Sequence, residues 1–164
     1  MSYNLNNGDR SIVYKTNWDV AFSYLSKNDS FRVVAVNEDA QNKIIIKNMN
    51  DQSDLNLIGL ENMNINRVAF SDDEKIIRIS AGSPNSPGDI YTYNLSTNKL
   101  NKITTNLNSS VNPDDLVNAE VIRYESFDGL EIPAILYKPH SAKKGNKVPA
   151  LVWVHGGPGG QSKV

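Results

Sequence analysis

The chain has 164 residues, a formal net charge of −1 at pH 7 and no cysteine. This length can bury one substantial core, and the balanced charge gives no basic excess for nucleic acid or an anionic membrane surface. Without cysteine, the chain has no disulfide, no thiolate zinc site and no cysteine nucleophile. The opening sequence MSYNLNNGDR lacks the apolar core of a secretory signal, and no run reaches membrane-spanning length, so we expect a cytoplasmic protein if Met1 is the natural start.

The first two thirds of the chain contain a repeat. The sequence Val-Ala-Phe-Ser at residues 20–23 recurs 48 residues later, at residues 68–71. Each copy is followed by short apolar segments that Asn, Asp, Ser and Gly turns separate. The segments lie near residues 31–36, 43–47 and 55–60 after the first copy, and 75–80, 89–93 and 99–104 after the second. A period of roughly 40 to 50 residues built from about four short strands is typical of β-propeller blades, so we expect two blades over residues 17–108.

Within the second unit, the pattern assigns residues to the interior and to turns. We expect Phe70, Ile79, Ile90 and Leu95 to face inward. Tyr91 and Tyr93 alternate along one strand, and packing explains them better than a ligand cage.

Two acidic groups, Asp72-Asp73-Glu74 and Glu38-Asp39, are candidate metal sites by composition. Neither has the alternating oxygen ligands and central glycine of a calcium loop, so we interpret both as turns. No metal and no cofactor are expected.

A change of composition marks a boundary before the last third of the chain. Residues 105–115 are rich in Asn, Ser and Pro without periodicity, and Asn112-Pro113 favours an extended or turning backbone. Beyond it, residues 120–126 and 131–138 are predicted strands joined by the turn Phe-Asp-Gly-Leu. Pro133 suits an edge strand because it cannot donate a ladder hydrogen bond.

The most informative segment is PALVWVHGGPGG, residues 149–160. Residues 148–154 predict a strand buried on both faces, and a glycine-rich loop follows directly. A phosphate-binding loop and a dinucleotide fingerprint both require glycine where this chain has Ser162, so both fail. The HGG-type oxyanion loop of α/β hydrolases fits without a mismatch.

This loop and the preceding YESFDGLEIPAILYKP, residues 124–139, resemble the prolyl oligopeptidase family of serine peptidases, nearest its acylaminoacyl peptidase and dipeptidyl peptidase branch. The resemblance covers roughly residues 114–164, and a weaker one to the family's propeller covers residues 17–108. It implies a mainly β chain of about two β-propeller blades followed by the first strands of an α/β-hydrolase sheet. Residues 1–113 would be the C-terminal part of the propeller, and residues 114–164 the start of the catalytic domain.

The resemblance also implies roles for three residues and a substrate. The backbone N–H of Gly157 would donate to the oxyanion, Gly156 would keep the turn open, and His155 would brace the loop. The whole enzyme would hydrolyse short peptides through an acyl-enzyme. We expect no nucleic acid or membrane partner.

The other groups that acyl transfer needs are missing from the chain. Ser162 lies beyond the predicted strand end, in half of a G-x-S-x-G motif, and His140 is expected to be a solvent-exposed residue of a Lys-rich segment. No Ser-His-Asp trio can be assembled. We therefore expect a piece of a longer peptidase that is inactive alone and either poorly soluble or partly molten. Two alternatives stay open: an esterase- or lipase-like hydrolase fragment with the same loop, and a non-catalytic propeller module for binding proteins.

Overall fold

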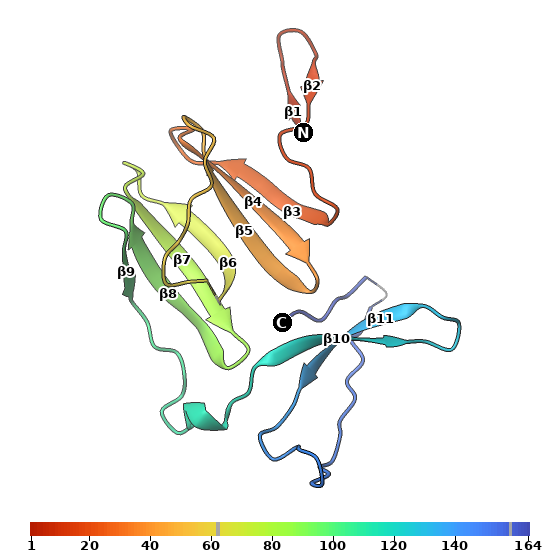
Figure 1. Cartoon of the computed structure of the whole chain (residues 1–164). Coiled ribbons are helices and arrows are strands. Elements are labelled where there is room, and N and C mark those ends of the chain that lie inside the picture. Colours follow the sequence, from red (N-terminus) through yellow and green to blue (C-terminus); the bar gives the residue numbers. More distant parts are fainter. Residues whose placement is uncertain (62, 158) are drawn as a thin grey trace.

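The computed structural model describes residues 1–61, 63–157 and 159–164, and over these residues the protein is mainly β, as predicted (Figure 1). All four sheets are antiparallel. Short strands β1 (Ser2–Tyr3) and β2 (Arg10–Ser11) form a small N-terminal sheet. We call the sheet of β3 (Asp19–Leu25), β4 (Phe31–Glu38) and β5 (Gln41–Asn48) the first sheet. We call the sheet of β6 (Asn64–Phe70), β7 (Ile76–Ser83), β8 (Ser86–Asn94) and β9 (Lys99–Lys102) the second sheet. The 3₁₀ turn η1 (Pro113–Asp115) precedes the hairpin β10 (Ala119–Glu125) and β11 (Glu131–Tyr137).

The first and second sheets begin with the same turn. In the first, the Ser26 amide donates to the Phe31 carbonyl over 2.8 Å, and the Ser26 hydroxyl accepts from the Phe31 amide over 2.9 Å. In the second, Ser71 and Ile76 make the same two bonds at 2.9 and 3.1 Å. Serine is suited to this position because its hydroxyl replaces a backbone partner in the turn. The two serines stand 45 residues apart.

Two other features repeat at the same spacing. The residue three positions after each serine, Asp29 or Glu74, has positive φ, 59° and 53° respectively. The strand before each turn has an irregular register, at Ala21 in β3 and at Asn66 in β6. The two sheets are therefore copies of one unit with a period of 45 residues.

The motif that suggested a period of 48 residues was misleading. Its first copy, residues 20–23, lies inside β3, whereas its second copy, residues 68–71, runs through the end of β6 into the turn. The two copies are three residues out of register in the structure. Four matching letters are weaker evidence than a repeated turn, because any β-strand favours the same few residue types.

The main core lies between the first and second sheets. One set of buried side chains comes from the first sheet and the segment after it, the other from β6, β7 and β8; they are Val33, Ile46, Leu57, Leu60, Val68, Ile77, Ile79, Ala81, Tyr91 and Tyr93. Phe31 and Phe70 stack at the edge of this core with ring centroids 5.1 Å apart. Residues 55–60 form no strand, yet they contribute Leu57 and Leu60 to it.

One inward-facing assignment was wrong. Ile79 is fully buried, and Phe70 and Leu95 pack against the core as expected, but Ile90 lies on the opposite face of β8. Alternate residues of a strand face opposite sides, so burial of Tyr91 places Ile90 outward. Tyr93 is also buried, and the expectation that the tyrosines pack inside is confirmed.

Polar contacts cross between the two sheets beside the apolar core. The Tyr24 hydroxyl donates to the Val68 carbonyl over 2.7 Å, and the Asn28 amide donates to Glu74 Oε1 over 2.6 Å. Burial acts to raise the pKa of Glu74, but its hydrogen bonds, including the one from Asn28, outweigh burial and lower it. The acidic segment that includes Glu74 is a turn, as predicted.

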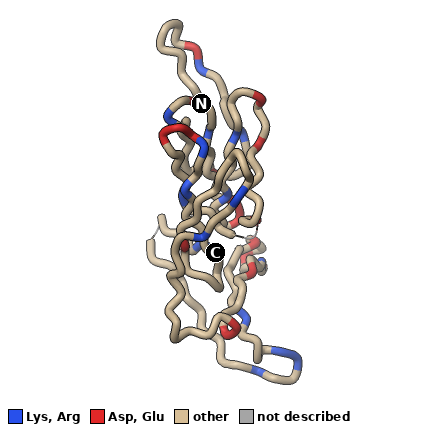
Figure 2. Tube along the Cα trace, turned by 90° about the vertical axis from the view of Figure 1, so that its left-hand side faces the viewer, with Lys and Arg blue, Asp and Glu red and all other residues tan. Residues whose placement is uncertain are grey.

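Lys and Arg residues alternate with Asp and Glu residues along most of the chain (Figure 2). Several form exposed ion pairs: Lys27–Asp72 at 2.9 Å, Lys43–Glu38 at 3.2 Å and Lys47–Asp54 at 3.0 Å. Such surface pairs contribute little to stability because water screens them. The apolar core is therefore the main source of cohesion.

The predicted hairpin near the C-terminal end of the chain is confirmed. Strands β10 and β11 pair from Ala119–Tyr137 to Glu125–Glu131, and Gly129 makes the turn with φ of 81°. Pro133 lies opposite Arg123 in a sheet that has only two strands, so both strands are edges.

The predicted buried strand over residues 148–154 is absent. These residues form no strand, and the side chains of Leu151, Val152, Trp153 and Val154 are 82 to 89% exposed. A strand buried on both faces needs neighbours to pair with and layers to cover it. The described residues place no strand beside this segment, so its apolar pattern finds no partner.

We expect Ile79→Ala to lower the free energy of unfolding by about 2–5 kcal/mol, because it leaves a cavity in the core between the sheets. Ile103→Ala is the matched control, since Ile103 is 59% exposed, and it should cost less than about 0.5 kcal/mol. Urea unfolding of both variants measures the difference. Equal losses at the two positions would show that the inter-sheet core does not stabilise the chain.

Candidate functional site

The candidate site is the glycine-rich loop, residues 155–160, that follows the exposed apolar run. His155, Gly156 and Gly157 are all exposed, so the main chain there is open to a ligand. The Nδ1 atom of His155 lies 3.0 Å from the Gly156 carbonyl oxygen, to which a protonated Nδ1 donates. This contact fixes the imidazole against the loop that it begins.

The loop turns back on itself so tightly that a side chain does not fit at Gly160 and would be crowded at Gly157. A Cβ at Gly157 would lie 3.0 Å from the amide nitrogens of Gly159 and Gly160. A Cβ at Gly160 would overlap the Gly156 carbonyl oxygen. Neither Gly157 nor Gly160 has the left-handed φ that favours glycine, so close approach of the backbone explains both. The predicted sharp turn is present.

The residues after the loop form hydrogen bonds with the first and second sheets. Figure 1 shows the C-terminal end of the chain beside the turn that joins β4 and β5. Three hydrogen bonds join the tail to this hairpin: Asn37 Nδ2 to Gln161 Oε1 at 2.7 Å, Lys163 Nζ to Asn42 Oδ1 at 2.8 Å, and the Val164 amide to the Ala40 carbonyl at 2.9 Å. A fourth joins Asn64 Nδ2 of β6 to the Val164 carbonyl at 2.8 Å.

The same β4–β5 turn also holds the β10–β11 hairpin. Arg123 of β10 forms an ion pair with Asp39, and its Nε lies 3.1 Å from Glu131 of β11. One short turn of the first sheet therefore contacts both segments that the sequence assigns to a second domain.

A cavity of about 640 Å³ opens beside this turn. Its wall combines apolar side chains such as Ile44 and Leu57 with polar ones that include Asn42 and Asn64. Val121 of β10 completes it. Since Asn42 and Asn64 also bind the tail, the segment after the glycine loop runs along the rim of the cavity.

The structure does not assemble the rest of a hydrolytic site. Within the described part of the chain, no hydrogen bond joins Ser162 to His140 or His155. Among those residues there is also no group of three or more His, Cys, Asp or Glu side chains placed to hold a metal ion. None of the described segments forms a helix of the length and apolarity needed to span a membrane.

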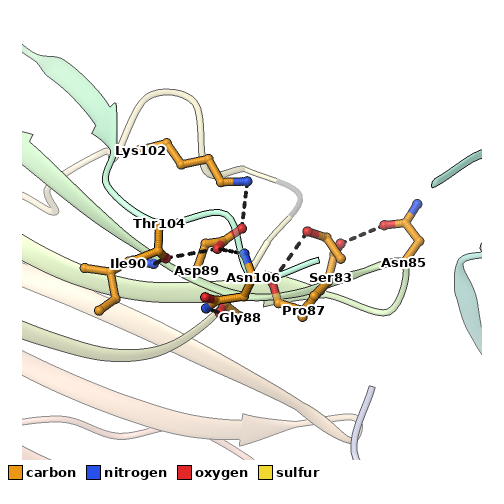
Figure 3. Close-up of polar contacts among 10 residues, drawn as sticks. Ser83, Asn85, Pro87, Gly88, Asp89, Ile90, Lys102, Thr104 and Asn106 are labelled. Atoms are coloured by element: carbon orange, nitrogen blue, oxygen red, sulfur yellow. Dashed lines mark hydrogen bonds and ion pairs between the residues drawn. The ribbon is translucent and has the colours of Figure 1, made fainter. Parts of the chain in front are cut away.

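A second buried polar group, which the sequence analysis missed, surrounds Asp89 (Figure 3). Its carboxylate is 1% exposed and receives Lys102 Nζ at 2.6 Å, the Thr104 hydroxyl at 3.0 Å and the Asn106 amide at 2.9 Å. The Lys102 contact lowers the pKa of Asp89; burial opposes this, and the Thr104 and Asn106 bonds add to the lowering.

The Asp89 group is structural rather than catalytic. Both carboxylate oxygens are engaged, and the Thr104 hydroxyl also accepts from the Ile90 amide at 2.9 Å, so the network ties the chain after β9 to β8. The signal was in the sequence: Asp89 stands two residues before Tyr91 on the alternation that buries both tyrosines. A charge on a buried face requires a partner.

We expect the stability that Asp89 provides to depend on pH. Because its pKa is lowered on folding, the contribution is complete above the unfolded value of about 3.9 and is lost as pH falls through the lower folded value. The stability difference between the wild type and Asp89→Asn, measured by urea unfolding, should shrink between about pH 5 and about pH 2. The same substitution at exposed Asp115 is the control. A difference independent of pH would contradict the ion pair.

The loop geometry predicts different outcomes for neighbouring glycines. Gly160→Ala should displace the whole loop, because the new methyl group overlaps the Gly156 carbonyl, whereas Gly159→Ala meets no atom within 4 Å. The amide ¹⁵N and ¹H shifts of Gly156 and Gly157 report the change. Large shifts in Gly160→Ala and small ones in Gly159→Ala are expected; the reverse order would rule out this turn.

Comparison with known proteins places the fold. No family model and no curated protein matches the sequence. Among solved structures, the chain is similar to prolyl oligopeptidase B from Galerina marginata in the apo form (TM-score 0.60, 20% identity). It is also similar to mutants of that enzyme bound to a 35mer hydrolysis and macrocyclization substrate (0.61, 21%) and to a 25mer macrocyclization substrate (0.61, 20%). Each match covers 79% of this chain and 18% of the other. The chain thus shares its fold with less than a fifth of that protein.

Proposed function

We propose that the chain belongs to a serine peptidase of the prolyl oligopeptidase family and supplies the oxyanion loop of its active site. One observation carries the proposal: a chain that folds like part of prolyl oligopeptidase B also has HGGPGG in a turn that demands glycine. The fold and the loop are independent features, since one is set by the two sheets and the other by a few residues beyond them.

In this proposal the first and second sheets are neighbouring propeller blades. The 45-residue unit, with the same serine turn and the same irregular strand in each copy, supports that assignment. Residues 1–113 then belong to the propeller and residues 114–164 to the beginning of an α/β-hydrolase domain. In this proposal the rest of that domain would cover the apolar side chains of residues 151–154, which are exposed here.

The chemistry assigned to the loop is charge stabilisation. A serine oxygen attacks the peptide carbonyl carbon, and a histidine takes the hydroxyl proton. The carbonyl oxygen becomes an oxyanion that accepts a hydrogen bond from the Gly157 N–H, while Gly156 and His155 shape the turn. The C–N bond then breaks, the amine leaves with the proton, and water hydrolyses the acyl-enzyme. Serine, histidine and aspartate would come from residues outside this sequence, and the substrates would be short peptides.

Two other functions explain less. An esterase- or lipase-like hydrolase would use the same loop, but the repeated sheets would have no counterpart in it. A non-catalytic propeller module that binds proteins would explain the sheets and leave the glycine turn without a role.

The test begins with the gene. If the reading frame continues past Val164 with G-x-S-x-G, then Asp and then His, the protein that it encodes should react with a fluorophosphonate probe and hydrolyse short peptides. The 164-residue chain alone should do neither. A stop codon directly after Val164 in the natural gene, or labelling of the short chain, would refute the proposal.

In that longer protein, Gly157→Ala should lower kcat for peptide hydrolysis by up to about 10²–10³, the cost of losing one oxyanion donor, because the added methyl group crowds the Gly159 and Gly160 amides and shifts the Gly157 N–H away from the oxyanion. Gly159→Ala, which meets no atom within 4 Å, is the matched control and should retain most of the activity. Ester substrates cleaved far better than peptides would favour the esterase-like function instead.

A further inference from the structure

We propose that the turn joining β4 and β5 is an anchor that holds the glycine-rich loop in place, with Asn37 and Asn42 as positioning residues. The assignment of a catalytic purpose to this contact rests on the proposed function. The contact itself stands on the geometry of residues 37–42 and 161–164, which are far apart in the sequence.

The anchor forms hydrogen bonds with the chain immediately after the loop. Gln161 follows Gly160 directly, and its side chain accepts from Asn37 Nδ2 over 2.7 Å. Lys163, two residues on, donates to Asn42 over 2.8 Å. The first bond restrains the loop at its last glycine, and the second prevents the tail from rotating about the first. The Val164 amide also donates to the Ala40 carbonyl of the turn, and Asn64 of β6, outside the anchor, donates to the Val164 carbonyl.

The turn that forms the anchor is itself strained. Glu38 pairs with Gln41, so only Asp39 and Ala40 lie between the strands, with φ of 51° and 63°. Such two-residue turns prefer Asn-Gly because both positions are left-handed, and alanine is disfavoured there because its Cβ crowds the following carbonyl oxygen. Yet the Ala40 carbonyl accepts from the Val164 amide, and the Asp39 carboxylate binds Arg123 of β10. Besides reversing the chain, the turn therefore binds the C-terminal tail and strand β10.

Asn37 also makes its contact at a cost to stability. Its Oδ1 is buried and has no hydrogen-bond partner among the described residues, although its Nδ2 is used. Burying an amide oxygen without a donor is unfavourable, because the oxygen loses its hydrogen bonds to water and gains none in return. An apolar residue would avoid that cost and would lose the bond to Gln161.

Positioning matters for this loop more than for most. Glycine gives the chain more conformational freedom than any other residue, and an oxyanion donor works only if it is held at hydrogen-bonding distance before the charge develops. The described residues of the loop, 155–157 and 159–160, are exposed. Fixing its C-terminal end to a sheet with a buried core is a direct way to limit that freedom.

NMR relaxation of the Gly157 and Gly160 amides in the 164-residue chain tests the anchor. In the wild type the order parameters should be near about 0.85, and in the double variant Asn37→Ala/Asn42→Ala they should fall below about 0.6. Lys163→Met removes the Asn42 bond from the tail side, without touching the sheet, and should loosen the loop in the same direction. Asn101→Ala, an exposed asparagine on β9, is the control and should change neither amide.

A covalent link provides the complementary test. Because the chain has no cysteine, Asn42→Cys/Lys163→Cys can be joined by a short bis-maleimide, and joining should restore the order parameters that the unlinked pair loses. Asn101→Cys/Lys163→Cys should not link within one chain. A loop that is mobile in the wild type, or equally rigid in all variants, would overturn the anchor. Rigid positioning in a longer protein that hydrolyses no peptide would instead refute only the proposed function.

Discussion

The structure depends on burial of apolar side chains between two small sheets, neither of which could fold alone. Three or four strands bury too little surface to offset the conformational entropy of ordering them, so each sheet needs the other. The first sheet contributes Val33 and Ile46, and the second contributes Ile77, Ile79 and Tyr93, all nearly inaccessible to water. The β10–β11 hairpin and the residues after the glycine loop make polar contacts with this pair.

The order of the strands and the position of the loop could be predicted from the sequence because both are local properties. Short apolar segments between Asn, Asp, Ser and Gly turns are sufficient to define β4, β5, β7 and β8. The close approach of the backbone at Gly157 and Gly160 is likewise local, because the turn that causes it is only a few residues long. Alternation along β8 was misapplied at Ile90, although the neighbouring tyrosines carried the information needed to place it.

Contacts between distant segments could not be predicted in the same way. Nothing in the sequence near Asp89 names Lys102, Thr104 or Asn106 as its partners, and nothing near Gln161 names Asn37. The strand expected at residues 148–154 failed for the same reason: its apolar pattern describes an environment, and the environment has to be supplied by other strands. The repeat is another example: the structural period of 45 residues is marked by a shared turn geometry, whereas the identical residues stand 48 residues apart.

The bond between the Asn28 amide and the Glu74 carboxylate determines how the two sheets are aligned. Apolar surfaces tolerate sliding, because one methyl group replaces another at little cost. A carboxylate withdrawn from water does not, since a shift of one residue would leave it without its donor. The turns at Ser26 and Ser71 are therefore poor places for insertions, unlike most surface loops. The Asn28–Glu74 hydrogen bond therefore adds a directional, charge-based constraint on the spacing of the two units to the less specific apolar contacts.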